Sequence, residues 1–453
     1  MKQMIYPFLF ITILCLSAAG DEFQVNTHTT WDQADPDVAA AADGNFIVVW
    51  RSYGQDGSSN GIFGQRYDPN CRPAGEEFLI NTTTAGNQTE PAVAMSSAGF
   101  VVTWTGPGIF DLNQEDIFAQ WFDPNGTPIG NELQTNSNTS GRQIYPSAAM
   151  SRTGECIIVW ESIDFPEEGD RMICGQMFDN AGIRIGDEFI ISDVQSPSRY
   201  PDAAMDPNGN FAVVWMVDKS TDSIMTRLYY ADGSAKTEPF KVNSIGFKSV
   251  TQPAIVMNAA GGFVVTWDGD PNLAALDNIH ARMFDPNGAA LGEQFIVNTS
   301  LEQAQQNPRA AMSEQGEFVI VWDSRIDPNV NERDIFGQRF NSFGEPLGGE
   351  FQINTTVEAD QRYPAVAMGQ NGQFLTVWQS DEQDGSRFGI FGSANFIVNP
   401  ADFNCDGMVD FRDYCILAKE WHKTEDPLTS NLIDDGTIDE KDLAEFCRRW
   451  LRP

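Results

Sequence analysis

The chain has 453 residues and a formal net charge of −36, with 41% hydrophobic and 11% aromatic residues. This acidity argues against nucleic acid as a partner, because phosphate binding depends on Lys and Arg, and it favours divalent cations. The 39 Gly and 24 Pro supply the many turns that an all-β fold needs, and the apolar content suffices for a sizeable core.

Residues 1–20 are predicted to be a secretory signal peptide. Lys2 provides a positively charged start, residues 5–16 are apolar, and residues 17–20 are small. The apolar run is too short to cross a membrane, and no later stretch approaches the roughly 18 apolar residues that a span needs. We therefore expect an exported bacterial protein, secreted or at the cell surface, with no membrane span.

Tryptophans recur at intervals of 52 to 56 residues through the next part of the chain. A proline stands thirteen or fourteen residues before each of them, and a phenylalanine stands four residues before it, replaced by Cys156 in the third copy. Landmarks that stay in register across seven copies indicate an internal repeat. The tryptophans are Trp50, Trp104, Trp160, Trp215, Trp267, Trp322 and Trp378.

Each copy contains four strand-like runs, which in the second copy cover residues 77–81, 91–95, 100–104 and 117–122. Seven such copies predict an all-β fold, a seven-bladed β-propeller over residues 21–397, because a closed ring covers the apolar face that each blade alone leaves open. A row of small β-sandwich modules is the alternative. Residues 22–26 and residues 395–399 compete to complete the last blade, and the sequence leaves that choice open.

The repeat resembles those of large bacterial secreted proteins, with the pattern Glu-Phe-x-Val-Asn-Thr, then Gln-x-x-Pro-x-Val-Ala, then Gly-Phe-Val-Val-x-Trp. In the last copy this pattern reads Glu350 to Thr355, Gln361 to Pro364, and Phe374 to Trp378. The resemblance covers residues 21–397. It implies export and a non-enzymatic role at a surface, and it names no substrate.

Residues 402–413 have the spacing of a calcium loop. Oxygen-bearing side chains stand at positions 1, 3, 5, 9 and 12, a glycine stands at position 6, and the carbonyl of position 7 is available. The predicted ligands are Asp402, Asn404, Asp406, Met408 through its carbonyl, Asp410 and Asp413. A second copy over residues 431–442 predicts Asn431, Asp435, Thr437 through its carbonyl, Asp439 and Asp442. In that copy Ile433 at position 3 weakens the site or shifts the loop to use Asp434.

Each calcium loop leads into a predicted helix, over residues 413–421 and 442–450, with an apolar stripe on one face. This duplication resembles the type I dockerin family over residues 401–452. The resemblance implies a small all-α, EF-hand-like domain at residues 398–453 that holds two Ca²⁺ ions and docks onto a cohesin domain, often within polysaccharide-degrading machinery. Small hydroxyl residues that often contact the cohesin are replaced here by Phe411-Arg412 and Glu440-Lys441. The calcium fold is therefore better supported than any particular partner.

The sequence shows no catalytic constellation. Among the histidines His28, His280 and His422, His280 replaces a repeat phenylalanine, which favours a packed side chain. No serine flanked by glycines indicates a nucleophile elbow. The sequence leaves open a catalytic pair of carboxylates like that of glycosidases. The candidates outside the repeat pattern are Glu161, Asp164, Glu167, Glu168, Asp170, Asp268 and Asp270. A glutamine that recurs in the fourth run as Gln65, Gln120, Gln176 and Gln338 predicts a structural hydrogen bond.

Two interpretations of function follow. In the first, the protein is a secreted, calcium-binding, modular protein whose propeller is a binding or scaffold module, attached by the dockerin-like tail to an extracellular assembly in polysaccharide degradation. In the second, it is a carbohydrate-active enzyme, a glycoside hydrolase or lyase, with its site on the propeller loops. The sequence names neither ligand nor substrate.

Cysteines replace phenylalanine at two repeat positions of the third copy. Cys156 stands four residues before Trp160, and Cys174 stands in the following strand where Phe63 stands in the first copy. Because both exchanges fall in one hairpin, a disulfide between Cys156 and Cys174 is predicted, provided that the two Cβ atoms lie within about 3.5–4.5 Å. Two buried free thiols that act as small hydrophobes are the alternative.

Overall fold

The computed structural model describes most of residues 22–395 and a part of the C-terminal segment. The described residues are 22–108, 114–163, 171–192, 196–218, 222–247, 249–270, 276–325, 332–369, 372–395, 414, 417–419, 421 and 439–450. The chain divides into two compact units, residues 21–394 and residues 395–453 together with 1–20. Among the described residues, no helix is long and apolar enough to cross a membrane.

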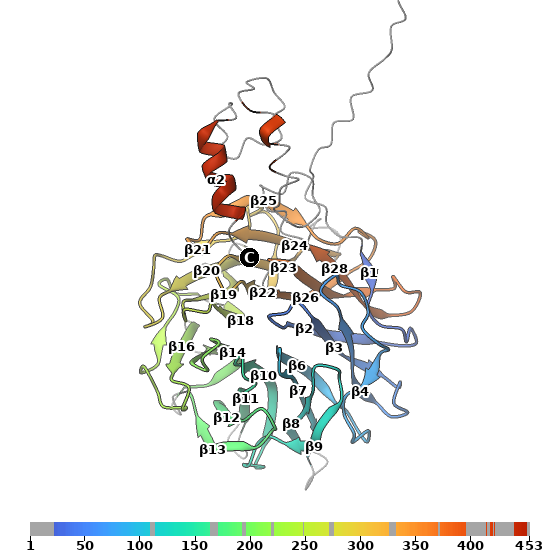
Figure 1. Cartoon of the computed structure of the whole chain (residues 1–453). Coiled ribbons are helices and arrows are strands. Elements are labelled where there is room, and N and C mark those ends of the chain that lie inside the picture. Colours follow the sequence, from blue (N-terminus) through green and yellow to red (C-terminus); the bar gives the residue numbers. More distant parts are fainter. Residues whose placement is uncertain are drawn as a thin grey trace, which may run out of the picture. The chain divides into compact units, whose positions relative to one another are not determined.

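The larger unit is a seven-bladed β-propeller, as the repeat predicts. Seven four-stranded antiparallel sheets lie radially around an axis (Figure 1). The innermost strands contact one another in a closed cycle around that axis, in the order β2, β6, β10, β14, β18, β22 and β26. Blade 1 consists of β2–β5, blade 2 of β6–β9, blade 3 of β10–β13, blade 4 of β14–β17, blade 5 of β18–β21, blade 6 of β22–β25, and blade 7 of β26–β28 with β1.

The strands of the propeller are β1 (Phe23–Gln24), β2 (Gln33–Ala40), β3 (Phe46–Tyr53), β4 (Asn60–Tyr67), β5 (Phe78–Leu79), β6 (Thr89–Ser96), β7 (Gly99–Pro107), β8 (Glu115–Phe122), β9 (Pro128–Gln134), β10 (Arg142–Met150), β11 (Cys156–Ile163), β12 (Arg171–Phe178), β13 (Arg184–Ile190), β14 (Ser198–Met205), β15 (Phe211–Val217), β16 (Ser223–Tyr229), β17 (Phe240–Lys241), β18 (Ser249–Met257), β19 (Phe263–Asp270), β20 (Asn278–Phe284), β21 (Phe295–Ile296), β22 (Gln305–Met312), β23 (Phe318–Arg325), β24 (Arg333–Phe340), β25 (Pro346–Gln352), β26 (Gln361–Met368), β27 (Phe374–Asp381) and β28 (Phe388–Asn395).

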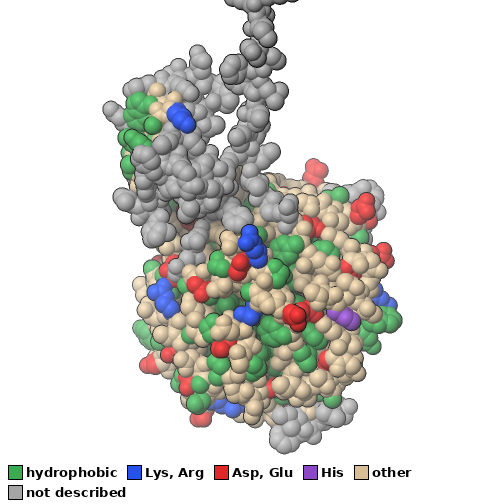
Figure 2. All heavy atoms as spheres, turned by 45° about the vertical axis from the view of Figure 1, so that its right-hand side comes forward, with side chains coloured by type: hydrophobic (Ala, Val, Ile, Leu, Met, Phe, Trp, Pro, Cys, Tyr) green, Lys and Arg blue, Asp and Glu red, His purple; other side chains and the backbone are tan. Residues whose placement is uncertain are grey.

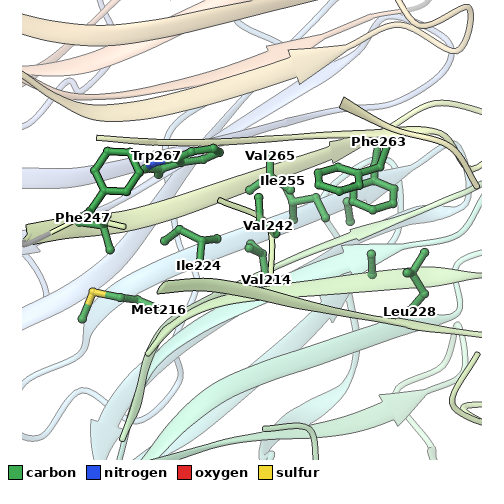
Figure 3. Packing of buried hydrophobic residues seen from close by; sticks show 14 residues of the cluster. Val214, Met216, Ile224, Leu228, Val242, Phe247, Ile255, Phe263, Val265 and Trp267 are labelled. Carbon is green, nitrogen blue, oxygen red and sulfur yellow. The ribbon is translucent and has the colours of Figure 1, made fainter. Parts of the chain in front are cut away.

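The hydrophobic core lies between neighbouring blades. The seven repeat tryptophans are at most 1% exposed. One cluster combines Val214 and Ile224 of blade 4 with Val265 and Trp267 of blade 5, so that side chains of the two sheets interleave (Figure 3). Because the middle strands are buried on both faces, they read as continuous apolar runs, and each blade depends on its neighbours for burial.

The N-terminal strand closes the ring. β1 pairs with β28, with Phe23 opposite Gly392 and Gln24 opposite Phe391. The Asn26 amide oxygen accepts a 2.7 Å hydrogen bond from the Ile390 backbone N–H. Residues 22–26 therefore take the place for which residues 395–399 compete in the sequence, and the last blade is built from both ends of the propeller sequence.

The Glu-Phe-x-Val-Asn-Thr motif works as a hydrogen-bonding unit within and between blades. In six blades its asparagine accepts from the backbone N–H of an isoleucine in the third strand at 2.7 or 2.8 Å, as Asn81 does from Ile62. At six seams its Glu or Gln accepts from a Thr or Ser of the preceding blade, as Glu132 does from the Thr82 N–H and hydroxyl. The fourth-run glutamines form the predicted structural bonds, and Gln120 donates to the Trp121 and Ile129 carbonyls.

The disulfide predicted between Cys156 and Cys174 is wrong, because the structure holds both as buried cysteines that are not bonded to each other. Strand register gives the reason: Cys156 lies opposite Phe178, whereas Cys174 lies opposite Trp160, four positions further along the ladder. In blade 2 the equivalent phenylalanines also contact separate partners, since Phe100 stacks on Phe122 and Phe118 stacks on Trp104. The two cysteines replace two different ring contacts and act as small hydrophobes.

The second unit contains the helix α2 (Glu440–Trp450). Its start is fixed by a reciprocal cap, in which Asp439 accepts from the Lys441 N–H and Asp442 accepts from the Asp439 N–H. The cap places the first helical residue two positions before the expected residue 442. Tyr414 and Phe446, one from each predicted apolar stripe, lie with ring centroids 6.1 Å apart.

Ring closure by the N-terminal strand predicts a large effect of Asn26→Ala. The substitution leaves the buried Ile390 N–H without its acceptor, and we expect the free energy of unfolding to fall by about 1–3 kcal/mol. Urea denaturation followed by tryptophan fluorescence measures this change. Asn298→Ala, which removes the equivalent bond to Ile279 within blade 5, is the matched control and should cost a similar amount. An unchanged transition in Asn26→Ala alone would contradict closure by residues 22–26.

Candidate ligand-binding face around the propeller axis

One face of the propeller carries the connections between successive blades and the turns between the second and third strands of each blade. These segments vary most in length and sequence between copies, as the blade 1 loop 54–59 and the blade 5 segment 271–277 illustrate. The opposite face carries short, regular turns such as residues 123–127. We call the first of these the loop face, and variation on a regular scaffold is typical of a functional surface.

A β-bulge interrupts the innermost strand of every blade close to the loop face. The pairing register shifts at the same place in each copy, for example between Ala34 and Asp37 in blade 1. The residue just before the repeat proline has a positive φ, between 31° and 55°. These seven residues, which we call the mouth ring, are Asp35, Glu90, Tyr145, Tyr200, Gln252, Asn307 and Tyr363.

The backbone of the mouth ring is held by side chains of the preceding blade. The Tyr145 N–H donates to Glu90 at 2.9 Å, the Tyr200 N–H donates to Glu161 at 3.4 Å, and the Tyr363 N–H donates to Asp323 at 3.3 Å. A left-handed conformation of a residue other than glycine costs roughly 1–3 kcal/mol and persists only where its surroundings impose it. Its repetition around the axis makes the ring a rigid, preorganised feature.

Tyr145 and Tyr200 form an aromatic pair across the seam between blades 3 and 4. Their ring centroids are 5.0 Å apart with an interplanar angle of 61°, and both side chains are partly exposed. Burial raises the pKa of Tyr145 to about 12, and the nearby Glu90, Tyr200 and Glu161 act in the same direction. The phenol therefore remains protonated at neutral pH and can donate a hydrogen bond.

Ion pairs gather on the loop face although the protein has few basic residues. Glu161, fully buried, pairs with Arg171, and the buried Asp323 pairs with Arg333 at 2.5 Å. One described ion pair, between Arg152 and Glu314, lies at the opposite face. Further pairs on the loop face are Arg51–Asp35, Arg142–Glu115, Arg199–Asp218, Arg362–Asp360 and Arg387–Asp32. Paired guanidinium and carboxylate groups present fixed hydrogen-bonding atoms rather than a net positive patch.

Charged residues also lie on the innermost strands just inside the mouth ring. Asp37 accepts from the Val93 N–H at 2.8 Å, and Asp202 accepts from the Ile255 N–H at 2.9 Å and the Ser147 hydroxyl at 2.7 Å. Burial raises the pKa of Asp37 to about 6, and the negative charge of Asp202 adds to the effect while Arg309 opposes it. These groups come from blades 1, 4 and 6, so they act on one another across the axis.

Three of the carboxylates singled out in the sequence, Glu161, Asp268 and Asp270, lie within the described residues. Glu161 is bound to Arg171 and to the Tyr200 N–H, and Asp268 and Asp270 are buried. The remaining candidates, Asp164, Glu167, Glu168 and Asp170, lie outside the described residues. His280 is packed as expected, stacked on Trp267 at 5.8 Å, and burial lowers its pKa to about 4.

The predicted calcium ligands lie outside the described residues except for two. Asp439 and Asp442 form the cap of α2 described above. The described part of the chain contains no group of three or more metal-ligating side chains. The ligands in residues 402–413 and in residues 431–437 stay predictions.

Sequence reasoning missed the mouth ring, although a pattern could have revealed it. The repeat proline is constant, whereas the residue before it is Asp, Glu, Tyr, Gln or Asn from copy to copy. A residue that varies between polar and aromatic types beside the constant proline indicates a side chain that does not pack in the core. The bulge that turns these residues toward the loop face is visible only in the strand register.

The fold and the site define a seven-bladed β-propeller with a structured axial mouth. No protein-family model and no curated protein matches the chain. Among solved structures it is similar to a protein of unknown function from Dyadobacter fermentans, with 11% identity and a TM-score of 0.48, covering 83% of this chain and 98% of that one. A polysaccharide lyase described as an ulvan lyase gives 11% identity and a TM-score of 0.49, covering 82% and 95%. The NanB sialidase of Streptococcus pneumoniae gives 10% and 0.47, covering 82% and 70%. Such likeness concerns the fold and not the activity.

The raised pKa of Asp37 predicts a pH-dependent stability. An acid whose pKa is higher in the folded state stabilises the protein fully below its unfolded pKa of 3.8, and this contribution is lost as the pH rises through about 6. Asp37→Asn retains the acceptor for the Val93 N–H and removes the charge. We expect thermal unfolding at pH 7 to show a gain on the order of 1–3 kcal/mol, and at pH 4 no gain. An equal effect at both pH values would contradict the assignment.

Proposed function

We propose that the propeller is the binding module of a secreted modular protein, and that it takes a polysaccharide chain at the mouth ring. The observation that supports this most directly is the partly exposed pair Tyr145 and Tyr200 at the axial end of a rigid ring of hydrogen-bonding side chains. Sugar rings present C–H faces that pack on aromatic side chains and hydroxyls that bond to amides and carboxylates. The mouth ring offers tyrosines, carboxylates and amides, and no basic residue.

Charge favours a neutral glycan. The protein has a formal net charge of −36, and the arginines named on the loop face are already paired with carboxylates. An anionic polysaccharide would meet repulsion from the protein as a whole. Acidic and basic side chains are interspersed with apolar ones over the surface seen in Figure 2, with no large patch of one sign on the described part of that face.

Binding explains the described carboxylates better than catalysis does. A glycosidase needs one protonated acid and one carboxylate facing the scissile bond. Here Glu90, Glu161 and Asp323 each accept a backbone N–H of the next blade, and the last two are also ion-paired. These bonds assign the carboxylates to the scaffold. The enzyme alternative has to use carboxylates other than these three.

Tyr200→Ala should weaken binding without unfolding the protein. We expect calorimetric titration with neutral oligosaccharides, such as β-linked glucan and xylan hexamers, to show about tenfold lower affinity, because an aromatic contact residue carries binding energy of this order. Tyr230→Ala is the matched control, since Tyr230 is 48% exposed in a turn of the opposite face. Reducing-end assays on the same mixtures separate the two functions, because released sugars would establish the enzyme. Equal affinity of Tyr200→Ala and the parent would contradict the proposed site.

The second part of the proposal concerns the C-terminal segment. We infer that residues 398–453 form a calcium-dependent, dockerin-like attachment module whose partner is a cohesin-like domain or another extracellular protein. The loop spacing over residues 402–413 and 431–442 supports this, together with the capped helix α2 and the contact of Tyr414 with Phe446. The propeller would thus be delivered to an extracellular assembly.

Calcium should stabilise the C-terminal module by mass action, since the ion binds only the folded loops. In the full chain, titration of chelator-treated protein should reveal calcium binding that Asp406→Ala with Asp410→Ala abolishes at the stronger loop. Scanning calorimetry should show a transition that shifts upward with Ca²⁺, while the propeller transition stays in place. Absence of any calcium-dependent transition would contradict the module, and Asp43→Ala in the propeller is the control for loss of a surface charge.

A further inference from the structure

Trp31 occupies a position at which three other blades have a small residue with left-handed backbone. It stands five residues before the repeat proline, where blades 4, 5 and 6 have Ser196, Lys248 and Gln303 and blades 2, 3 and 7 have Gly86, Gly141 and Ala359. Trp31 shares left-handed backbone with the last three, with φ of 67° at Trp31, 85° at Gly86, 72° at Gly141 and 64° at Ala359. Glycine adopts this conformation freely, whereas a bulky side chain meets steric strain there.

The Trp31 side chain gains little from packing in return for this strain. It is 53% exposed, on the connection between blades 7 and 1 at the loop face. Its indole makes an edge contact with Tyr53, itself 45% exposed, at a centroid distance of 6.3 Å and an angle of 73°. A strained backbone that presents an exposed aromatic side chain points to a role outside the fold.

A cation and its counter-ion border this aromatic pair. The Arg387 guanidinium lies 5.8 Å from the centre of the Trp31 ring and comes from the loop of blade 7. It also forms a 3.5 Å ion pair with Asp32, the residue after Trp31. The guanidinium thus lies over the indole ring, and the aromatic pair has hydrogen-bonding groups beside it where blade 7 meets blade 1.

We propose that Trp31 and Tyr53 form a second sugar-binding subsite, which takes a neutral pyranose ring of the same polysaccharide chain that the mouth ring binds. The proposal rests on the proposed function of the loop face. The pyranose packs its C–H face on the Trp31 indole and hydrogen-bonds at its edge to Arg387 and Asp32. Tyr145 and Tyr200 lie on blades 3 and 4, so the two aromatic pairs would hold one long chain at two places on this face.

The test is Trp31→Gly, which introduces the residue of blades 2 and 3, measured with the same neutral glucan and xylan hexamers and with the corresponding long polysaccharides in affinity electrophoresis. Because glycine relieves the strain, we expect a melting temperature at least equal to that of the parent, together with about tenfold weaker binding. Trp31→Phe, which keeps an aromatic ring, should retain most of the affinity. Ala359→Gly is the matched control: it relieves the equivalent strain in blade 7 and should leave binding unchanged.

The outcomes separate this subsite from the proposed function. If Tyr200→Ala weakens binding and Trp31→Gly leaves it unchanged, the second subsite alone is overturned. A parent protein that binds none of these glycans would overturn both. Weaker binding by Trp31→Gly with a lowered melting temperature, and no recovery in Trp31→Phe, would assign the indole to the fold and also overturn the subsite.

Discussion

Each blade of this protein has apolar side chains on both faces of its sheet, and only another blade can cover them. The clusters that bury Trp50 and Trp267 each combine residues of two neighbouring sheets. Since hydrophobic burial is roughly proportional to the apolar area removed from water, an open row would leave two faces uncovered. The ring must therefore close, and the cluster around Trp50 joins Val48 of blade 1 to Val377 of blade 7 with Val25 of the N-terminal strand.

Packing closes the ring, but backbone N–H groups near the strand ends still need hydrogen-bond acceptors. Polar side chains at constant positions of the repeat supply these acceptors. The motif asparagine takes an N–H within its own blade, and the motif glutamate takes an N–H of the preceding blade. Near the axis, Glu90, Glu161 and Asp323 do the same for the mouth ring. Such hydrogen bonds hold the carboxylates in fixed orientations. A buried polar group that loses its hydrogen-bond partner destabilises the fold by more than the bond itself contributes to stability.

The surface proposed for binding is where residues other than glycine hold a left-handed backbone. Tyr145, Tyr200 and Tyr363 hold left-handed backbone in the mouth ring, and Trp31 does so at a position that is glycine in two other blades. None of these conformations follows from local preference, so the rigid ring must impose them. Aromatic side chains fixed in this way lose little conformational freedom on binding, which preserves affinity for a ligand as polar as a sugar.

The sequence by itself determined the number of blades, the four strands of each, the buried tryptophans and the structural glutamines, because these depend on a local pattern repeated seven times. Only the tertiary structure decided which strand closes the ring, since residues 22–26 and 395–399 share the pattern Phe-x-Val-Asn in the sequence, and the pairing of β1 with β28 is seen only in the fold. It also separated Cys156 from Cys174, whose place in one hairpin says nothing about register. The mouth ring depends on the bulge in seven inner strands brought around one axis, and neighbours in such a ring lie about fifty residues apart in the chain.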